Sequence, residues 1–296
     1  MLRNLLFACA LAATPAFAET ITIETYTGPA QVEANPNKIA VFDIGALDTL
    51  DALGVEVSGV VGPLFVDYVA DTADGAESVG TLFEPDFEAI AAGGYDLLIA
   101  AGRSSRVAPD LAKIAPTIDM TIWEDVVGQG LDRLDAYAEI FGKEEEAAAL
   151  RMEFDAALAD ARKAISDQGN ALIVLTNGTT VSAYGASGRF GWLHTALDLP
   201  EAVEAVEEAT HGEAISFEFI RDANPDILIV VDRAAAIGQD AEAAAATLDN
   251  ALVQETNAWQ SGNVIYLDPA PLYIAGGGIQ SMIGTLEEIT AAFPGS

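Results

Sequence analysis

Cysteine and basic residues are scarce in this chain of 296 residues. The single cysteine is Cys9, inside an apolar leader, so the chain beyond that leader excludes a disulfide framework and a thiolate site. Thirteen lysines and arginines stand against 46 acidic residues, which gives a formal net charge of −33. A surface this negative repels phosphates, and we therefore expect no binding of nucleic acid.

Catalytic motifs are missing as well. The glycines of residues 185–191 lack the spacing of a dinucleotide-binding loop, and the chain has no P-loop, no Gly-x-Ser-x-Gly elbow and no His-Glu-x-x-His motif. Its two histidines leave little for acid–base catalysis. They also argue against a site for a bare Zn²⁺ or Mn²⁺ ion, which needs about four converging ligands. We therefore do not expect an enzyme or a bare-metal binding protein.

Residues 1–18 have the pattern of a secretory signal peptide. Arg3 precedes an apolar run, which ends in the small-x-small sequence Ala16-Phe17-Ala18. The run is too short to span a membrane. A lipoprotein would need Cys9 as its acylated first residue, and the residues before Cys9 match that signal poorly. The pattern predicts cleavage after Ala18 and a periplasmic protein without a lipid anchor.

Short apolar runs alternate with helical stretches along the rest of the chain. Runs rich in valine, isoleucine and leucine, separated by helices, predict parallel sheets that helices cover on both faces. We therefore expect an α/β fold. The predicted strands are residues 39–44, 57–61, 97–101, 171–175, 180–183, 227–231 and 264–267, and a helix begins at residue 47.

An internal repeat relates two of these units. Residues 87–103 and 217–233 share seven of 17 aligned positions without a gap. Each segment has the pattern of a helix followed by a strand. An arginine, Arg103 or Arg233, lies just past the carboxyl end of that predicted strand. Ligands of open α/β sheets bind at that edge. The shared arginine therefore favours a duplicated binding unit over a chance likeness of two helix–strand units.

A long helix separates the two halves. Residues 143–166 are rich in alanine, glutamate and leucine, contain no glycine or proline, and place apolar residues at helical spacing. Such a helix is roughly 36 Å long and would join two lobes rigidly. We therefore divide the chain into a signal peptide (1–18), an N-terminal lobe (19–142), a linking helix (143–168) and a C-terminal lobe (169–296).

Three segments, residues 182–191, 210–233 and 266–275, carry a resemblance to a known family. Together they resemble the periplasmic substrate-binding proteins of iron-siderophore and cobalamin ABC importers, and most closely the binding proteins for ferric catecholate siderophores. The resemblance covers nearly the whole chain after the leader. It implies two Rossmann-like lobes with parallel sheets joined by one long helix. It further implies a monomer without an intrinsic cofactor, whose partners are a ferric siderophore and an inner-membrane ABC permease.

The resemblance also implies the binding residues. Three arginines that line the cleft in the family match Arg103, Arg189 and Arg233, and a histidine and a tyrosine that can bind iron there match His211 and Tyr273. Guanidinium suits this ligand because it stays charged, donates a fixed fork of hydrogen bonds and stacks on rings. Fe³⁺ prefers six ligands, so an imidazole and a phenolate could complete the shell around a siderophore with two catechols.

Five further side chains have expected roles in packing, in the cleft wall or in docking. We expect Tyr184 and Trp192 to form apolar walls of the cleft, and His194 to be a packing residue. Glu88 and Glu218 occupy equivalent places in the repeat and match, by position, acidic residues that dock onto the permease in the family.

Two alternatives stay open. The arginines could each form an ordinary surface ion pair with one of the many carboxylates. The ligand could be haem, cobalamin or a hydroxamate siderophore, since haem would also suit a tyrosine and arginines.

Overall fold

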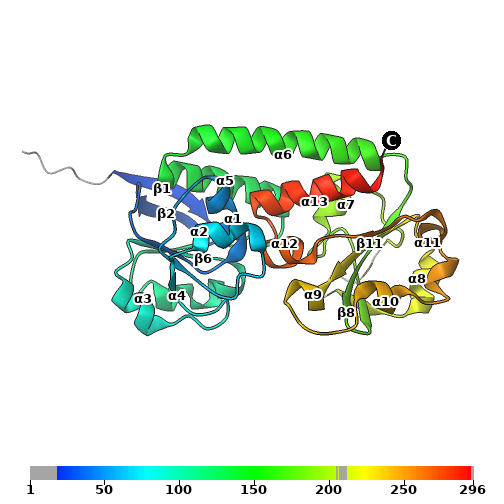
Figure 1. The fold of residues 1–296 in the computed structure, drawn as a ribbon. Helices are drawn as coiled ribbons and strands as arrows, with labels where there is room; N and C mark the ends of the chain where they lie inside the picture. The colour runs from blue at the N-terminus through cyan, green and yellow to red at the C-terminus, as the bar shows by residue number, and fades with distance from the viewer. Residues whose placement is uncertain (1–18, 205, 207–211, 295–296) are drawn as a thin grey trace, which may run out of the picture.

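The computed structural model describes residues 19–204, 206 and 212–294, and the signal peptide lies outside these residues. Two lobes, each built on a five-stranded sheet, lie side by side beneath α6 (Glu144–Ile165) (Figure 1). The two-lobe α/β architecture expected from the sequence is confirmed. No helix in the described part of the chain has the length and apolar character needed to cross a membrane.

The first lobe contains a β-hairpin and a fully parallel sheet with strand order β5-β4-β3-β6-β7. A 3₁₀ turn at Gly102–Val107 follows β6. Its strands and helices are β1 (Thr20–Thr25), β2 (Gly28–Glu33), β3 (Ile39–Val41), α1 (Ile44–Ala52), β4 (Gly59–Val60), α2 (Ala70–Ala73), β5 (Glu77–Ser78), α3 (Phe87–Gly93), β6 (Leu97–Ala100), α4 (Ala108–Leu111), β7 (Thr117–Asp119) and α5 (Val126–Phe141).

The second lobe has a sheet of order β10-β9-β8-β11-β12. Here the expectation of parallel strands needs correction, because β9 runs antiparallel to both β8 and β10. Only residues 178 and 179 separate β8 from β9, and so short a connection permits a hairpin but no crossover. Its elements are β8 (Ala171–Asn177), β9 (Thr180–Tyr184), α7 (Trp192–Ala196), β10 (Glu213–Ile215), α8 (Phe217–Ala223), β11 (Ile227–Asp232), α9 (Arg233–Ala236), α10 (Ala244–Leu248), α11 (Asn257–Ser261), β12 (Val264–Tyr266), α12 (Pro269–Ile274) and α13 (Ile279–Ala292).

The internal repeat forms the same local structure twice. Helices α3 and α8 start at a side chain that caps their first amides and end at a residue in the left-handed region, Gly94 (φ 63°) and Asn224 (φ 42°). The aspartate before each strand is also equivalent. Asp96 accepts a hydrogen bond from the amide of Lys38 at 2.9 Å, and Asp226 accepts one from that of Asn170 at 3.1 Å. Each aspartate thereby fastens its own strand to the segment leading into the neighbouring central strand.

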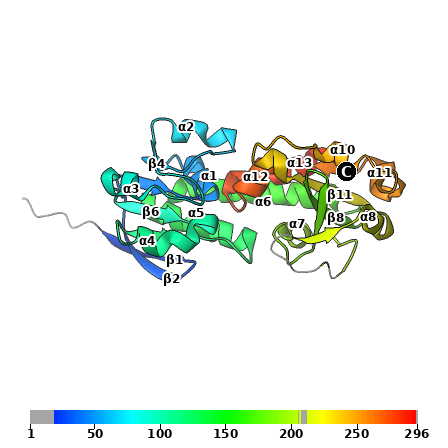
Figure 2. The ribbon, with the colours of Figure 1, turned by 90° about the horizontal axis from the view of Figure 1, so that it is seen from below.

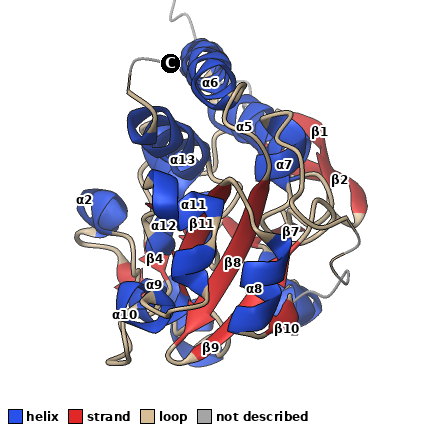
Figure 3. Ribbon diagram, turned by 90° about the vertical axis from the view of Figure 1, so that its right-hand side faces the viewer, coloured by secondary structure: helices blue, strands red, loops and turns tan. Residues whose placement is uncertain are grey.

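Three helices form the layer that spans the two lobes. Helix α6 buries Phe154 and Ala161 against α5 and α13, and its ends carry acidic and basic residues that complement its dipole. Figure 3 shows α5, α6 and α13 together on one side of the strands. Asp48 of α1 accepts hydrogen bonds from the amides of Gln280 and Ser281, at 2.9 Å each, so the start of α13 is fastened to the first lobe. The division of the chain into domains stays a prediction.

Candidate functional site

A cavity of about 620 Å³ lies between the two lobes and is lined by residues of both. Helix α12 lies between the lobes in both views (Figures 1 and 2), and its residues Leu272, Tyr273 and Ile274 line the cavity. The charged and aromatic residues that line the cavity are Asp43, Phe83, Arg103, Trp123, Arg133, Tyr137, Arg189, Trp192, Arg233 and Tyr273.

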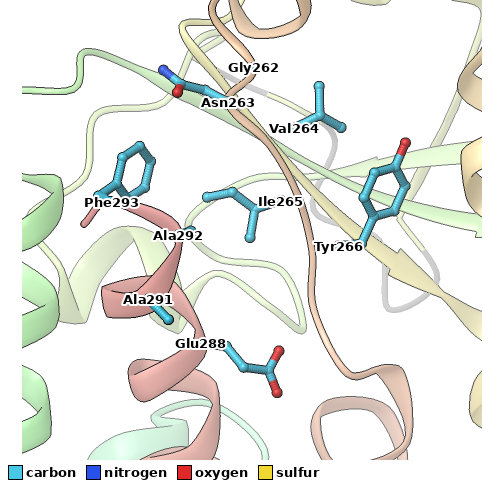
Figure 4. Close-up of a pocket in the computed structure, with 9 residues that line it drawn as sticks. All are labelled: Gly262, Asn263, Val264, Ile265, Tyr266, Glu288, Ala291, Ala292 and Phe293. Atoms are coloured by element: carbon cyan, nitrogen blue, oxygen red, sulfur yellow. The ribbon is translucent and has the colours of Figure 1, made fainter.

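A second cavity, of about 430 Å³, lies between β12 and the end of α13 (Figure 4). Glu288 is the one charged residue among the described residues that line it, and its carboxylate accepts a hydrogen bond from the amide of Asp268 at 2.8 Å. This cavity contains no cationic side chain, so it has no means of attracting an anion. The cavity between the lobes is therefore the candidate site.

The three arginines expected in the cleft, here called the arginine cluster (Arg103, Arg189 and Arg233), all line this cavity. Arg103 follows β6 in the 3₁₀ turn, and Arg233 is the first residue of α9, directly after β11. Both thus stand at the carboxyl end of a sheet strand, where the repeat places them. Arg189 comes from the glycine-rich loop between β9 and α7, in which a Cβ at Gly191 would collide with the carbonyl of Ala186.

The arginine cluster converges on the ring of Tyr273 in α12. The guanidinium carbons of Arg189, Arg103 and Arg233 lie 4.2, 5.5 and 6.0 Å from the ring centroid. Arg103 donates a hydrogen bond to the backbone carbonyl of Tyr273 at 3.0 Å, and Arg189 donates to the same carbonyl. The side chain of Arg233 donates from Nε to the phenol oxygen at 3.2 Å. Cation–π contacts and carbonyl oxygens thus orient three like charges toward one place.

None of these three arginines forms an ion pair with a carboxylate in the described part of the chain, although acidic residues are abundant. Exposed arginines elsewhere do form such pairs, as Arg151 does with Asp135 at 2.5 Å. The surface ion pairs considered from the sequence are therefore not what the structure shows for the arginine cluster. Its positive charge is left available to a ligand.

Two further charged residues at the cavity escaped the sequence analysis. Arg133 of α5 is buried and donates hydrogen bonds to the carbonyls of Glu24, Met120 and Thr121, at 2.9, 3.3 and 3.3 Å. Asp43 caps α1 by accepting from the amide of Ala46 at 3.0 Å. Burial raises the pKa of the Asp43 carboxyl, while the charges of Arg103 and Arg189 favour its ionised form. The placement of Arg133 on the buried face of an amphipathic helix was a signal that could have identified it.

The arginine cluster also changes the acidity of Tyr273. Burial alone would raise the pKa of its phenol, but the charges of Arg189, Arg233 and Arg103 and the hydrogen bond from Arg233 together lower it. The pKa of the Arg189 guanidinium is also lowered, by burial and by the neighbouring charge of Arg103. For a cation this shift disfavours the charged form. The mutual repulsion of Arg103 and Arg189 and the stabilised phenolate of Tyr273 have the same origin, the positive charge gathered at this cavity.

The remaining expected residues lie in different surroundings. Trp192 lines the cavity, whereas Tyr184 lies behind its wall, where its buried ring meets Phe190 edge to face at 4.8 Å. His194 is buried with Nδ1 3.0 Å from the Leu199 carbonyl, as a packing residue should be. His211 lies outside the described residues.

Outside the cavity, Glu88 and Glu218 are exposed in the first turns of α3 and α8, so the repeat gives them equivalent positions on the two lobes. Two exposed aromatic residues that line the cavity, Phe83 and Trp123, were not anticipated from the sequence.

Comparisons with known proteins identify the family of the chain. The family model described as "Periplasmic binding protein" matches residues 39–271. The petrobactin-binding protein YclQ of Bacillus subtilis is 34% identical over 264 residues, which cover 88% of this chain and 83% of the relative. The ferric-anguibactin-binding protein FatB of Vibrio anguillarum is 29% identical over 282 residues, which cover 92% of this chain and 87% of FatB.

Solved structures are similar over the same extent. The crystal structure of YclQ superimposes with a TM-score of 0.87 at 33% identity and covers 94% of this chain and 100% of that chain. The periplasmic catecholate-siderophore binding protein VctP of Vibrio cholerae gives a TM-score of 0.86 at 32% identity, over 92% of this chain and 100% of that chain.

The lowered pKa of Tyr273 is open to direct measurement. In an alkaline titration followed by ultraviolet difference spectra, we expect one tyrosine to ionise below the usual value of about 10, because the arginine cluster stabilises its phenolate. The Tyr273→Phe variant should lose this first step, and Arg103→Gln should move it to higher pH. A first step that persists in Tyr273→Phe would show that the cluster does not act on this phenol.

Proposed function

The chain belongs to the periplasmic binding protein family, whose members are substrate-binding components of ABC transporters and not enzymes, and we propose that it captures a ferric catecholate siderophore for iron uptake. The ligand would bind in the cavity between the lobes and be delivered to an ABC permease. It is the cargo of the protein, which needs no cofactor of its own for this task.

The observation that carries the proposal is the convergence of three guanidinium groups, none of them in an ion pair with a described residue, in a chain with a net charge of −33. A ferric catecholate is an anion whose negative oxygens surround the iron. A unit charge pair 4 Å apart contributes about 4 kcal/mol at an effective dielectric of ~20, before the cost of desolvation. Screening limits the opposing field of the whole protein to roughly 8 Å at physiological salt, so the local cluster decides affinity.

The relatives support the class of ligand. The names of YclQ, FatB and VctP refer to petrobactin, ferric anguibactin and a catecholate siderophore, respectively. These names favour an iron-siderophore complex over haem or cobalamin. The cavity is consistent with that choice, because four of the five charged residues that line it are arginines and they come from both lobes.

For a siderophore with only two catechols, we propose that Tyr273 and His211 supply the two remaining iron ligands. The phenol oxygen of Tyr273 accepts a hydrogen bond from Arg233, and its lowered pKa makes the phenolate that Fe³⁺ prefers easier to form. Trp192 would add an apolar wall, with Tyr184 supporting the loop of Arg189 from behind.

Glu88 and Glu218 would provide the contact with the permease, one from each lobe. Both carboxylates are exposed in the first turn of a helix, α3 or α8. Each helix precedes a strand that is followed by an arginine of the cluster. The family to which the chain belongs includes periplasmic proteins, and we propose that this one is exported by residues 1–18, cleaved after Ala18, and works as a monomer.

Binding of a ferric tris-catecholate should quench tryptophan fluorescence, and replacing the members of the arginine cluster should weaken that binding. Hydrogen bonds to charged groups contribute enough that we expect each of Arg103→Gln, Arg189→Gln and Arg233→Gln to lower the affinity by roughly tenfold or more. Titration at constant ionic strength measures the effect, and thermal unfolding verifies that each variant is folded.

The matched control is Arg221→Gln, which removes an exposed arginine that pairs with Asp222 on α8. This variant should bind as the unaltered protein does. Equal affinity in all three cleft variants would remove the anion site, and quenching by haemin or cobalamin but not by the catecholate would overturn the choice of ligand.

Direct coordination by Tyr273 and His211 predicts a spectroscopic change with a tetradentate catecholate. In Tyr273→Phe and His211→Ala the ligand-to-metal charge-transfer band of the bound ferric complex should shift, since each variant replaces one protein ligand by water. The hexadentate complex serves as the control, because its shell is already full and its band should not move. An unchanged band with the tetradentate complex would place both residues outside the iron shell.

The permease contact predicts a separation of binding from transport. Glu88→Gln and Glu218→Gln should retain full affinity for the ferric complex yet reduce uptake of radioactive iron by cells, most strongly when combined. Glu153→Gln, an exposed glutamate on α6 far from α3 (Figure 1), should leave uptake unchanged. Normal uptake by the double variant would contradict this assignment.

A further inference from the structure

We propose that Phe83 and Trp123, here called the aromatic rim, stack on the catechol rings of the ligand while the arginine cluster holds its charge. The proposal rests on the proposed function and adds a second mode of recognition to the same cavity. The rim belongs entirely to the first lobe, whereas the arginine cluster is drawn from both lobes.

Exposure first distinguishes the aromatic rim. Phe83 and Trp123 are 57% and 58% exposed, and both also line the cavity between the lobes. Single exposed aromatic residues are ordinary on a protein surface, as Tyr26 is here. Phe83 and Trp123 differ from Tyr26 because both line the same arginine-rich cavity. A ligand bound in that cavity would cover both rings and remove their apolar area from water.

The sheet topology places the two rings on either side of Arg103. Strand order in the first sheet is β5-β4-β3-β6-β7, so β5 and β7 are its outer strands. Phe83 lies in the loop after β5 and Trp123 in the loop after β7, whereas Arg103 follows β6, which lies inside the sheet. All three loops open at the carboxyl edge of the parallel strands. The loops of Phe83 and Trp123 thus start on opposite sides of the loop that carries Arg103, and we infer that a ligand held by Arg103 contacts both rings.

The loop that carries Phe83 is held in a fixed shape. The Thr81 hydroxyl accepts hydrogen bonds from the amides of Phe83 and Glu84 at 3.3 and 3.0 Å, and the Thr81 amide donates to the Glu84 carbonyl at 3.0 Å. Gly80 has a φ of 104° and no room for a Cβ beside the Glu84 carbonyl. Arg106 donates to the carbonyl of Phe83 at 3.3 Å. The turn thus keeps the ring at the cavity at little entropic cost on binding.

The second ring has its own support. The amide of Trp123 donates to the side-chain oxygen of Gln129 at 2.7 Å, which anchors the loop to α5. Neither aromatic side chain stacks on another ring or a cation among the described residues, and more than half of each is exposed. Aromatic rings associate face to face with an offset or edge to face, and a catechol offers such a ring next to its iron-binding oxygens.

Calorimetric titration with a ferric tris-catecholate tests the proposal, since calorimetry does not depend on the tryptophan signal. Ring stacking contributes enough that Phe83→Ala and Trp123→Ala should each weaken binding by roughly fivefold. Trp123→Phe, which keeps a ring, should recover most of the affinity, whereas Phe83→Leu, which keeps apolar area but no ring, should not. Tyr26→Ala is the matched control, because it removes an exposed ring that does not line the cavity.

The outcomes separate this proposal from the function on which it rests. If the unaltered protein does not bind the complex, the proposed function fails. If the unaltered protein binds it and both alanine variants bind equally well, the aromatic rim alone is refuted. Affinity in Phe83→Leu equal to that of the unaltered protein would refute stacking by that ring. Variants that lose iron uptake in cells at unchanged affinity would assign the rim to the permease contact and overturn the proposal.

Discussion

The site depends on three guanidinium groups that converge on one tyrosine and form no ion pair with any carboxylate of the described residues. Like charges repel, and in a chain this acidic the simplest arrangement would have been three ion pairs. Instead the backbone carbonyl of Tyr273 accepts from Arg103 and from Arg189, and the phenol accepts from Arg233. Neutral oxygens and a ring face orient the arginines, and Asp43, the one carboxyl among the described residues that line the cavity, forms no ion pair with them. What remains is a pocket of positive potential inside a negative protein.

The fold makes this convergence possible because parallel strands end at one edge of each sheet. The repeat delivers an arginine there twice, at Arg103 and Arg233, from helix–strand units with the same caps and the same anchoring aspartate. Helix α12 then places Tyr273 between the lobes. The next helix, α13, is hydrogen-bonded to Asp48 of the first lobe and packs against α6. The site is thus built from the two lobes and from the segment that ties them together.

Much of this could be predicted from the sequence, and the exceptions have physical reasons. The repeat identified two arginines and the family resemblance a third, because both depend on local order along the chain. The antiparallel course of β9 was missed, although the two residues before it leave room for nothing but a hairpin. Asp43 was missed because its neighbours at the cavity come from distant elements, whereas Arg133 had a local signal, its place on the buried face of α5, that the sequence analysis did not use. The reason that applies to Asp43 also holds for the aromatic rim, which depends on strand order and not on spacing.

The most direct test of the account is the position of iron in a crystal of the protein with a ferric catecholate, located by its anomalous scattering. The account predicts one strong peak in the cavity between the lobes, surrounded by the guanidinium groups of Arg103, Arg189 and Arg233. A peak elsewhere, for instance in the cavity beside β12 and α13, or guanidinium groups that turn away from the bound complex, would contradict it.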